Sequence, residues 1–312
     1  MRKTTTVLGE IAPEELGFCH SHEHLCIVRS LEKNLLINDY EKSLQELGLY
    51  FQAGGRSLVD AQPVGCGRDA GMLAGISENS GIHIIASSGF HKLSYYPENH
   101  WLRSCTEDNL VRLFVDELEQ GMYLDCDTAF PRQQGCAKAG QIKTALDTEG
   151  LTPGYQKLFI AAAEAAKITG CTLMAHIEQN SDPLSLAAFL DKQGLPSHRQ
   201  IFCHLDRAIA DISIHKEICE RGIYLEYDTI SRPKYHNDEK EADIIMEIVN
   251  AGYEKQLLMS LDSTRARLQS YGGSPGLVYI LKQFIPYLLC RGLTQAQINS
   301  FFVNNPAQVF SR

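Results

Sequence analysis

Short apolar segments alternate with longer amphipathic segments along most of the chain, and this alternation predicts parallel strands joined by helices. We predict strands at residues 17–24, 57–61, 82–88, 139–143, 172–177, 200–205, 222–227 and 256–262. Helical periodicity marks residues 68–79, 107–120, 155–169, 183–193, 211–221, 240–252, 276–289 and 294–302. Eight such strand–helix units favour a TIM-type (β/α)8 barrel. An open, doubly wound parallel sheet is the competing α/β architecture.

The 312 residues show no internal repeat and no Pro-, Gly- and Ser-rich linker. Single α/β barrels commonly have this length, and the hydrophobic share of 44% is enough for a large core. We therefore expect one domain that spans residues 1–312.

Composition and charge exclude several classes of function. The net charge of −9 argues against nucleic-acid binding, which needs an excess of Lys and Arg on one face. Residues 4–17 lack the apolar core of a signal peptide, and no later segment is long and apolar enough to span a membrane, so we expect a cytoplasmic protein without membrane contact. The ten cysteines contain no C-x-x-C pair, which is typical of reduced thiols.

The densest polar signal lies in the first predicted strand, Gly-Phe-Cys-His-Ser-His-Glu-His at residues 17–24. Side chains of a strand alternate between its faces, so we expect His20, His22 and His24 to share one face. The flanking apolar residues argue against a surface cluster of histidines. No histidine follows His22-Glu23 at the spacing of a helical H-E-x-x-H site, which excludes that class of zinc protease.

Four further predicted strands close with Lys143, His176, His204 and Asp262. Each histidine alone would more often be a core residue than a ligand, but the strands of a TIM barrel all end at one mouth, so these side chains should converge there. Imidazole and carboxylate suit zinc and related divalent ions, and two such ions can share a hydroxide. Spacing leaves two interpretations of Lys143 open: a carbamate that bridges two ions, or a salt bridge to Asp262.

A glycine-rich segment, Gly65-Cys-Gly-Arg-Asp-Ala70, has the G-x-G-x-x-A form of a dinucleotide-binding loop. The acidic residue that such a site needs near the end of the next strand is absent, because that strand closes with Ala86-Ser87-Ser88. We therefore expect no dinucleotide cofactor.

Together these motifs resemble the phosphotriesterase-related branch of the amidohydrolase superfamily. The resemblance extends in order over residues 7–310, nearly the whole chain. The matching segments are His22-Glu-His24-Leu, Gly140-Gln-Ile-Lys143, Ala175-His176, Cys203-His204, Ser260-Leu-Asp262 and Asn304-Asn-Pro306-Ala.

The resemblance implies a binuclear centre of two divalent ions, with zinc as the expected metal. The implied ligands are His22, His24 and Asp262 for one ion and His176 and His204 for the other. Lys143, carboxylated by carbon dioxide, and a hydroxide would bridge the two ions. Asp262 would also be the catalytic residue that takes the proton when the hydroxide attacks. The resemblance implies no role for His20. Two placements therefore stay open: behind the ligands, or facing the substrate.

The implied reaction is hydrolysis of an ester-type bond, with a sugar lactone as the leading substrate. Basic and aromatic residues after the third, seventh and eighth strands predict that this small molecule is anionic. The candidate substrate-binding residues are His91, Lys92, Tyr95, Arg232, Lys234, Tyr235, Arg265 and Arg267. Hydrolysis of phosphoesters or amides, and a non-catalytic barrel with a vestigial metal site, are the alternatives. Relatives of this family are often dimeric, so the resemblance also suggests a homodimer.

Overall fold

Eight short segments of buried residues form the parallel strands of the computed structural model, which describes residues 2–312. The strands are β3 (Cys19–Glu23), β4 (Ser57–Asp60), β5 (His83–Gly89), β6 (Ala139–Leu146), β7 (Leu173–Ile177), β8 (Gln200–Cys203), β9 (Tyr224–Tyr227) and β10 (Leu257–Met259). Each strand pairs in parallel with its neighbour in sequence, from β3 to β10. This sequential order confirms the predicted barrel and excludes the doubly wound sheet, whose strand order reverses.

The barrel closes between its first and last strands. Within the described residues no main-chain ladder joins β3 to β10, but the two strands lie side by side. The backbone N–H of Asp262, just after β10, donates to the carbonyl oxygen of His22 at 3.2 Å. We call this boundary the seam.

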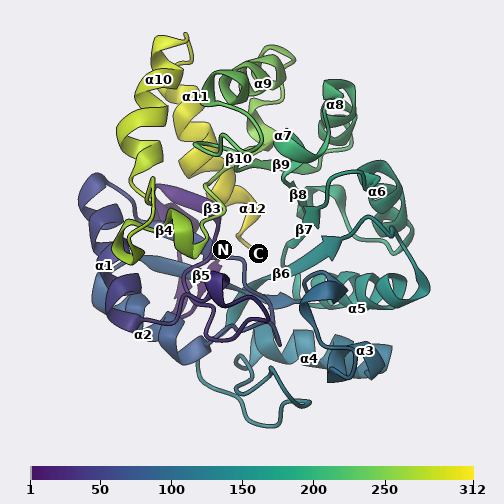
Figure 1. Cartoon of the computed structure of the whole chain (residues 1–312). Coiled ribbons are helices and arrows are strands. Elements are labelled where there is room, and N and C mark those ends of the chain that lie inside the picture. Colours follow the sequence, from purple (N-terminus) through teal and green to yellow (C-terminus); the bar gives the residue numbers. More distant parts are fainter. Residues whose placement is uncertain (1) are drawn as a thin grey trace.

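The helices surround the barrel, as Figure 1 shows in a view along its axis. The longer ones are α1 (Tyr40–Ala53), α2 (Ala70–Ser80), α4 (Glu107–Glu119), α5 (Pro153–Thr169), α6 (Pro183–Lys192), α8 (Ile212–Glu220) and α9 (Asp238–Asn250). The shorter ones are α3 (Trp101–Ser104), α7 (Leu205–Ala208), α10 (Ile285–Cys290), α11 (Gln295–Asn299) and α12 (Asn305–Val309), with π-helical turns at Ile280–Phe284 and Ser300–Asn304. None of the helices in residues 2–312 combines the length and the hydropathy that a membrane crossing requires.

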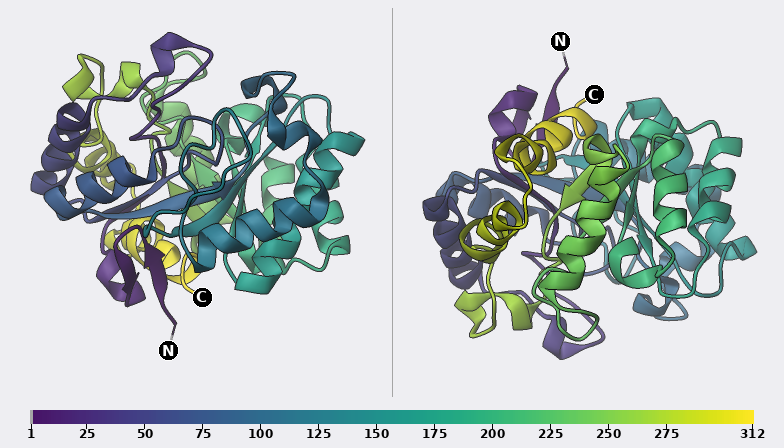
Figure 2. Two further views of the ribbon diagram at one scale, coloured as in Figure 1. Left: turned by 90° about the horizontal axis from the view of Figure 1, so that it is seen from below. Right: turned by 90° about the horizontal axis from the view of Figure 1, so that it is seen from above.

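A short hairpin of β1 (Thr4–Thr6) and β2 (Gly9–Ile11), which the sequence did not predict, lies at the N-terminal end of the barrel. Lys3 and Arg312 exchange backbone hydrogen bonds at 3.0 and 2.9 Å, so the two ends of the chain lie together (Figure 2). Val309 and Phe310 pack with residues of the barrel interior and close this end.

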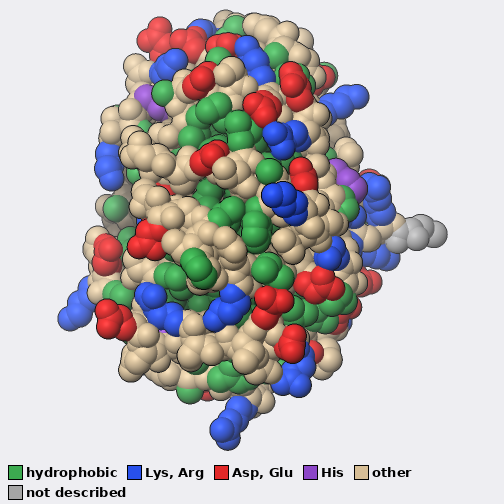
Figure 3. Space-filling model, turned by 90° about the vertical axis from the view of Figure 1, so that its right-hand side faces the viewer, with side chains coloured by type: hydrophobic (Ala, Val, Ile, Leu, Met, Phe, Trp, Pro, Cys, Tyr) green, Lys and Arg blue, Asp and Glu red, His purple; other side chains and the backbone are tan. Residues whose placement is uncertain are grey.

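The barrel interior is apolar towards this closed end, where Val59, Ile85, Met174, Ile201 and Leu258 belong to one buried cluster. Polar residues replace this cluster at the carboxyl ends of the strands. On the outer surface that Figure 3 shows, acidic and basic side chains are intermixed. All ten cysteines are free thiols.

Candidate metal centre

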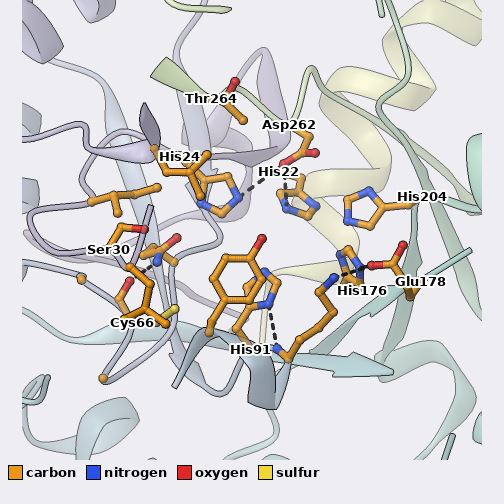
Figure 4. A pocket seen from close by; sticks show the side chains of 18 of the residues that line it. His22, His24, Ser30, Cys66, His91, His176, Glu178, His204, Asp262 and Thr264 are labelled. Carbon is orange, nitrogen blue, oxygen red and sulfur yellow. Dashed lines mark hydrogen bonds and ion pairs between the residues drawn. The ribbon is translucent and has the colours of Figure 1, made fainter. Parts of the chain in front are cut away.

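A cavity of about 690 Å³ lies at the carboxyl ends of the strands. It is lined by the imidazoles of four of the predicted ligands and by the carboxylate of a fifth; these are His22, His24, His176, His204 and Asp262. Figure 4 shows their side chains directed towards one another. Lys143, the sixth, lies within contact distance of this group and has no exposed surface. Five strands or strand ends thus bring the predicted ligands together.

Three of these side chains form a group that can hold a metal ion. Asp262 Oδ1 lies 3.4 Å from His24 Nε2 and 3.7 Å from His22 Nε2. All three ligand atoms lie within 4.8 Å of one another, and two imidazoles with one carboxylate form a donor set that suits zinc. The residues therefore fit the implied ion.

The other two histidines face the same space. The rings of His176 and His204 are 4.5 Å apart, and those of His22 and His204 are 4.9 Å apart. Two imidazoles are too few for a second closed site, but Lys143 Nζ lies 3.1 Å from His22 Nε2. The salt bridge from Lys143 to Asp262 is not formed, because Asp262 pairs instead with Arg207 at 2.9 Å and with Arg232 at 2.8 Å.

Buried carboxylates contact the far side of two imidazoles. Glu226 Oε2 lies 3.3 Å from His22 Nδ1, and Asp228 Oδ2 lies 2.5 Å from His204 Nδ1. Both carboxylates have no exposed surface. A carboxylate beside Nδ1 leaves Nε2 for the cavity, which is how metal-binding histidines are commonly oriented.

Burial governs the protonation of this region. Burial lowers the pKa of His22, His176 and His204 below the ordinary value, so their imidazoles are neutral and can act as ligands. Burial, together with the neighbouring Asp228 carboxyl, raises the pKa of Glu226 well above its ordinary value.

Two of the predicted ligands have unusual backbones. Asp262 has φ 47° and His204 has φ 71°, both in the left-handed region. Such a conformation costs an L-residue about 1–2 kcal/mol, and strain of this kind concentrates at functional sites. Hydrogen bonds from neighbouring strands must therefore hold these two residues in place.

The prediction that His20 shares a face with His22 and His24 is wrong. The register between β3 and β4 shifts between His20 and Glu23, so three steps along β3 match two along β4. A bulge of this kind adds one residue and reverses the alternation of faces. The His20 ring lies 4.7 Å from that of Tyr50 on α1, outside the barrel and behind the ligands.

Five of the eight predicted substrate-binding residues line the cavity: His91, Lys92, Tyr95, Arg232 and Tyr235. The other three, Lys234, Arg265 and Arg267, are not among its lining residues.

The three residues outside the cavity have other surroundings. Arg267 donates to the carbonyl oxygens of Ile230 and Ser231 at 2.7 and 2.8 Å, and burial lowers its pKa to about 10. Arg265 donates to the carbonyl oxygen of Leu36 at 2.9 Å. Lys234 is exposed. Charge on a loop after a strand was thus too coarse a signal to identify the residues of the cavity.

The predicted cations that do line the cavity are paired with carboxylates. Lys92 Nζ lies 2.5 Å from Glu178 Oε2, which also lies 3.2 Å from His176 Nε2. Contacts with His176 and then Lys92 hold the pKa of Glu178 well below its ordinary value. Arg232 pairs with Asp262 as described above.

Sequence reasoning missed four charged residues of the cavity: Arg29, Asp127, Glu178 and Arg207. Glu178 follows His176 by two residues and Arg207 follows His204 by three, so the positions just after the ligands were the available signal. Arg29 is exposed and makes no ion pair within residues 2–312. No motif marks it.

Comparison with known proteins gives a consistent result along the whole chain. The sequence profile of the phosphotriesterase family matches residues 2–310. The N-acetyltaurine hydrolase of Xenopus tropicalis is 29% identical over 98% of this chain and 97% of its own length. The phospho-furanose lactonase of Mycoplasmopsis synoviae (strain 53) is 29% identical over 98% of this chain and 91% of its own. The crystal structure of a lactonase from Listeria monocytogenes has a TM-score of 0.89 and 29% identity, covering 99% of this chain and 98% of that one.

Proposed function

Because the chain belongs to the phosphotriesterase family, we propose that it is a metal-dependent hydrolase that opens lactones carrying an anionic group. One observation carries this proposal: four imidazoles, a carboxylate and a buried lysine from five strands meet at one cavity. Burying such polar groups is costly unless they have a ligand or a partner, which argues against a vestigial site.

We assign one divalent ion to His22, His24 and Asp262 and a second to His176 and His204, with zinc as the expected metal. The neutral imidazoles and the short distances within the first group support this assignment. Two such ions, when bound, would lower the pKa of water and polarise the oxygen of the scissile bond.

We propose that Lys143 is carboxylated and links the two ions. Its amine has no exposed surface, and the atom beside it is an imidazole nitrogen, which offers no negative charge to balance an ammonium. Carboxylation by carbon dioxide would convert the amine into an anionic group with two oxygens. That group would supply the donor that His176 and His204 lack for a second site.

Asp262 is the proposed acceptor of the proton from the attacking water. Its Oδ1 faces His22 and His24, while its Oδ2 is held by Arg207 and Arg232 at 2.9 and 2.8 Å. One oxygen is therefore fixed by two guanidinium groups, and the other remains directed into the site.

The cavity volume of about 690 Å³ suits a small molecule. Part of its wall is formed by the rings of His91, Tyr95 and Tyr235. The rings of His91 and Tyr95 are 4.3 Å apart. Among the cavity cations Arg29 makes no ion pair within the described chain, so it is available to an anionic group of the substrate. The relatives named above act on a phospho-furanose lactone and on N-acetyltaurine, and both compounds are anionic.

Metal analysis and a substrate panel test the proposal. We expect about two divalent ions per chain, and the highest kcat/KM for a phosphorylated sugar lactone among that lactone, a neutral lactone, N-acetyltaurine and an aryl phosphotriester. A preference for N-acetyltaurine would reassign the protein to amide hydrolysis. Protein without bound metal and without turnover after growth with zinc would favour a non-catalytic binding barrel.

A further inference from the structure

Glu23 lies between two of the predicted ligands on β3, yet its side chain does not line the cavity. Its carboxylate has no exposed surface and accepts three hydrogen bonds. Oε1 accepts from the backbone N–H of Leu261 at 2.9 Å and contacts His20 Nδ1 at 2.7 Å. Oε2 accepts from the backbone N–H of Ser263 at 2.9 Å.

The two backbone donors flank Asp262, whose own N–H donates to the carbonyl oxygen of His22 at 3.2 Å. Three successive amides after β10 are thus bonded to β3. No main-chain ladder joins β3 to β10 in the described chain, so the Glu23 side chain takes the place of strand pairing at the seam. We call this arrangement of Glu23 and His20 the clamp.

The clamp acts on a strained residue. Asp262 has φ 47°, which a residue with a Cβ rarely adopts, and its carboxylate direction depends on keeping that backbone conformation. Fixing the amides on both sides removes the freedom through which the backbone could relax. The side chain then stays directed at His22 and His24.

His20 has a defined place in this arrangement. Its ring lies 4.7 Å from that of Tyr50 and 5.9 Å from that of Phe18, and His20 has no exposed surface. Packing on these rings limits its rotation, so Nδ1 stays directed at Glu23 Oε1.

We propose that Glu23, held by His20, is a positioning residue that fixes Asp262 at the seam so that its carboxylate can act together with His22 and His24. This inference rests on the proposed function of Asp262. It also requires that loosening the clamp weakens metal binding more than an equal loss of stability elsewhere would.

The test is the Glu23→Gln variant of the full chain. A glutamine has one acceptor oxygen and one NH2 group, so it would present a donor to one of the two backbone N–H groups. We expect the amides of Leu261 and Ser263 to exchange at least about 10-fold faster in the chelated protein. Zinc affinity, measured by competition with a chelator, should fall about 10- to 100-fold.

Glu46 provides a matched control. This buried carboxylate on α1 also accepts two backbone amides after β10, from Ser270 at 2.8 Å and Leu277 at 3.0 Å, but it does not contact Asp262. Glu46→Gln should lower the free energy of unfolding by a comparable amount. It should leave zinc affinity, and the exchange of the Leu261 and Ser263 amides, within about twofold of wild type.

If the two variants change amide exchange and zinc affinity equally, Glu23 is merely structural and the inference is overturned. If Glu23→Gln does not fold, variants of His20 provide the test. His20→Leu should weaken zinc binding, whereas His20→Asn, which keeps an amide donor near the position of Nδ1, should retain most of the wild-type zinc affinity. Equal effects of those two variants would also overturn the inference. A wild-type chain that binds no zinc would contradict the proposed function, while amide exchange would still report on the clamp.

Discussion

Several side chains at the centre of this cavity are held by polar groups from other strands or loops. Glu226 contacts His22, and two guanidinium groups share Asp262 Oδ2. The charges of Arg207 and Arg232 are already neutralised by these contacts, so these two arginines stabilise the site. An arginine without such a contact can instead bind an anionic substrate. Arg29, which makes no ion pair in residues 2–312, is of the second kind.

Replacing Arg29 with alanine therefore tests recognition of an anion. We expect KM for a phosphorylated lactone to rise about 5- to 20-fold, because an exposed charge-assisted contact is worth about 1–2 kcal/mol. Turnover of a neutral lactone should not change. Arg265→Ala is the control, since that guanidinium donates to the Leu36 carbonyl oxygen outside the cavity. Equal losses on charged and neutral lactones in Arg29→Ala would remove this residue from substrate recognition.

Lys143→Met tests the proposed carbamate. Methionine has a similar shape but cannot be carboxylated, so we expect no more than one tightly bound divalent ion per chain and loss of at least about 10² in kcat. In Lys143→Ala, added short-chain carboxylic acids should restore part of the activity by supplying the missing anion. A fully metallated and active Lys143→Met protein would contradict the assignment.

At the scale of elements, carboxylates at or just after the ends of three strands attach neighbouring loops to one another. Asp60 at the end of β4 accepts from the Leu25 N–H at 2.8 Å, next to His24. Asp206 accepts from the N–H groups of Asp228 and Thr229 at 2.9 and 2.7 Å. With Glu23, these side chains continue the hydrogen bonding between neighbouring strands beyond their last paired residues at these three places.

The close approach of β5 to β6 restricts the backbone of Lys143. Gly89 ends β5 with φ 92°, and a Cβ there would lie 1.9 Å from the Lys143 carbonyl oxygen. Gly89→Ala should cost about 3 kcal/mol or more in urea unfolding and weaken zinc binding. Gly150→Ala, at φ 68° with no neighbour within 4 Å, should cost only about 1 kcal/mol and leave zinc binding unchanged. Equal costs would show that the strand contact can relax.

A buried acid at the start of α9 makes stability depend on pH. Burial, together with Asp206, raises the pKa of Glu241 well above its ordinary value, and Glu241 Oε2 lies 2.6 Å from His236 Nε2. The folded chain therefore keeps a proton that the unfolded chain releases above its pKa of about 4.3. The contribution of Glu241 to stability should therefore fall as pH rises from 5 towards 8, by up to about 1.4 kcal/mol per pH unit.

Glu241→Gln has the shape of the protonated acid and carries no such proton. Urea unfolding at pH 5 and pH 8 should show that the variant gains stability relative to wild type as pH rises. A constant difference between the two proteins would mean that Glu241 ionises alike in both states.

The strands and the six candidate ligands could be predicted because buried strands give continuous apolar segments whose last residues share one end of a barrel. Helix α1 could not be predicted from the sequence. Its buried face includes Ser43 and Glu46 beside Leu47 and Tyr50, and these polar residues weaken the apolar periodicity. The place of His20 depends on a bulge that periodicity cannot show.

The cavity cations were the least predictable part of the site. A loop residue can turn towards the cavity or away from it, and only the path of the chain decides. Arg267 is only three residues from Thr264, which lines the cavity, but its guanidinium donates to the Ile230 and Ser231 carbonyl oxygens. Charge and sequence position give no direction for a side chain on an irregular loop.

For the whole molecule, the seam is the place where the sheet lacks main-chain pairing in the described residues. The proposed ligands His22, His24 and Asp262 lie on its two sides. An ion held by these residues would join the first and last strands, so metal binding should stabilise the barrel as a unit. The predicted single domain of residues 1–312 should then unfold in one transition.

Chelation should therefore lower Tm while the barrel stays folded at room temperature, because the apolar core does not depend on the metal. An ion that binds only the folded chain, at about 1,000 times its Kd, adds about 4 kcal/mol to stability. For a chain of this size, that is a Tm decrease on the order of 10 °C on metal removal. Adding zinc should reverse it. Asp262→Ala, which removes the ligand beyond the seam, should show a much smaller zinc-dependent gain in calorimetry. An unchanged Tm after complete metal removal would mean that the ions do not join β3 to β10, and that the clamp alone closes the barrel.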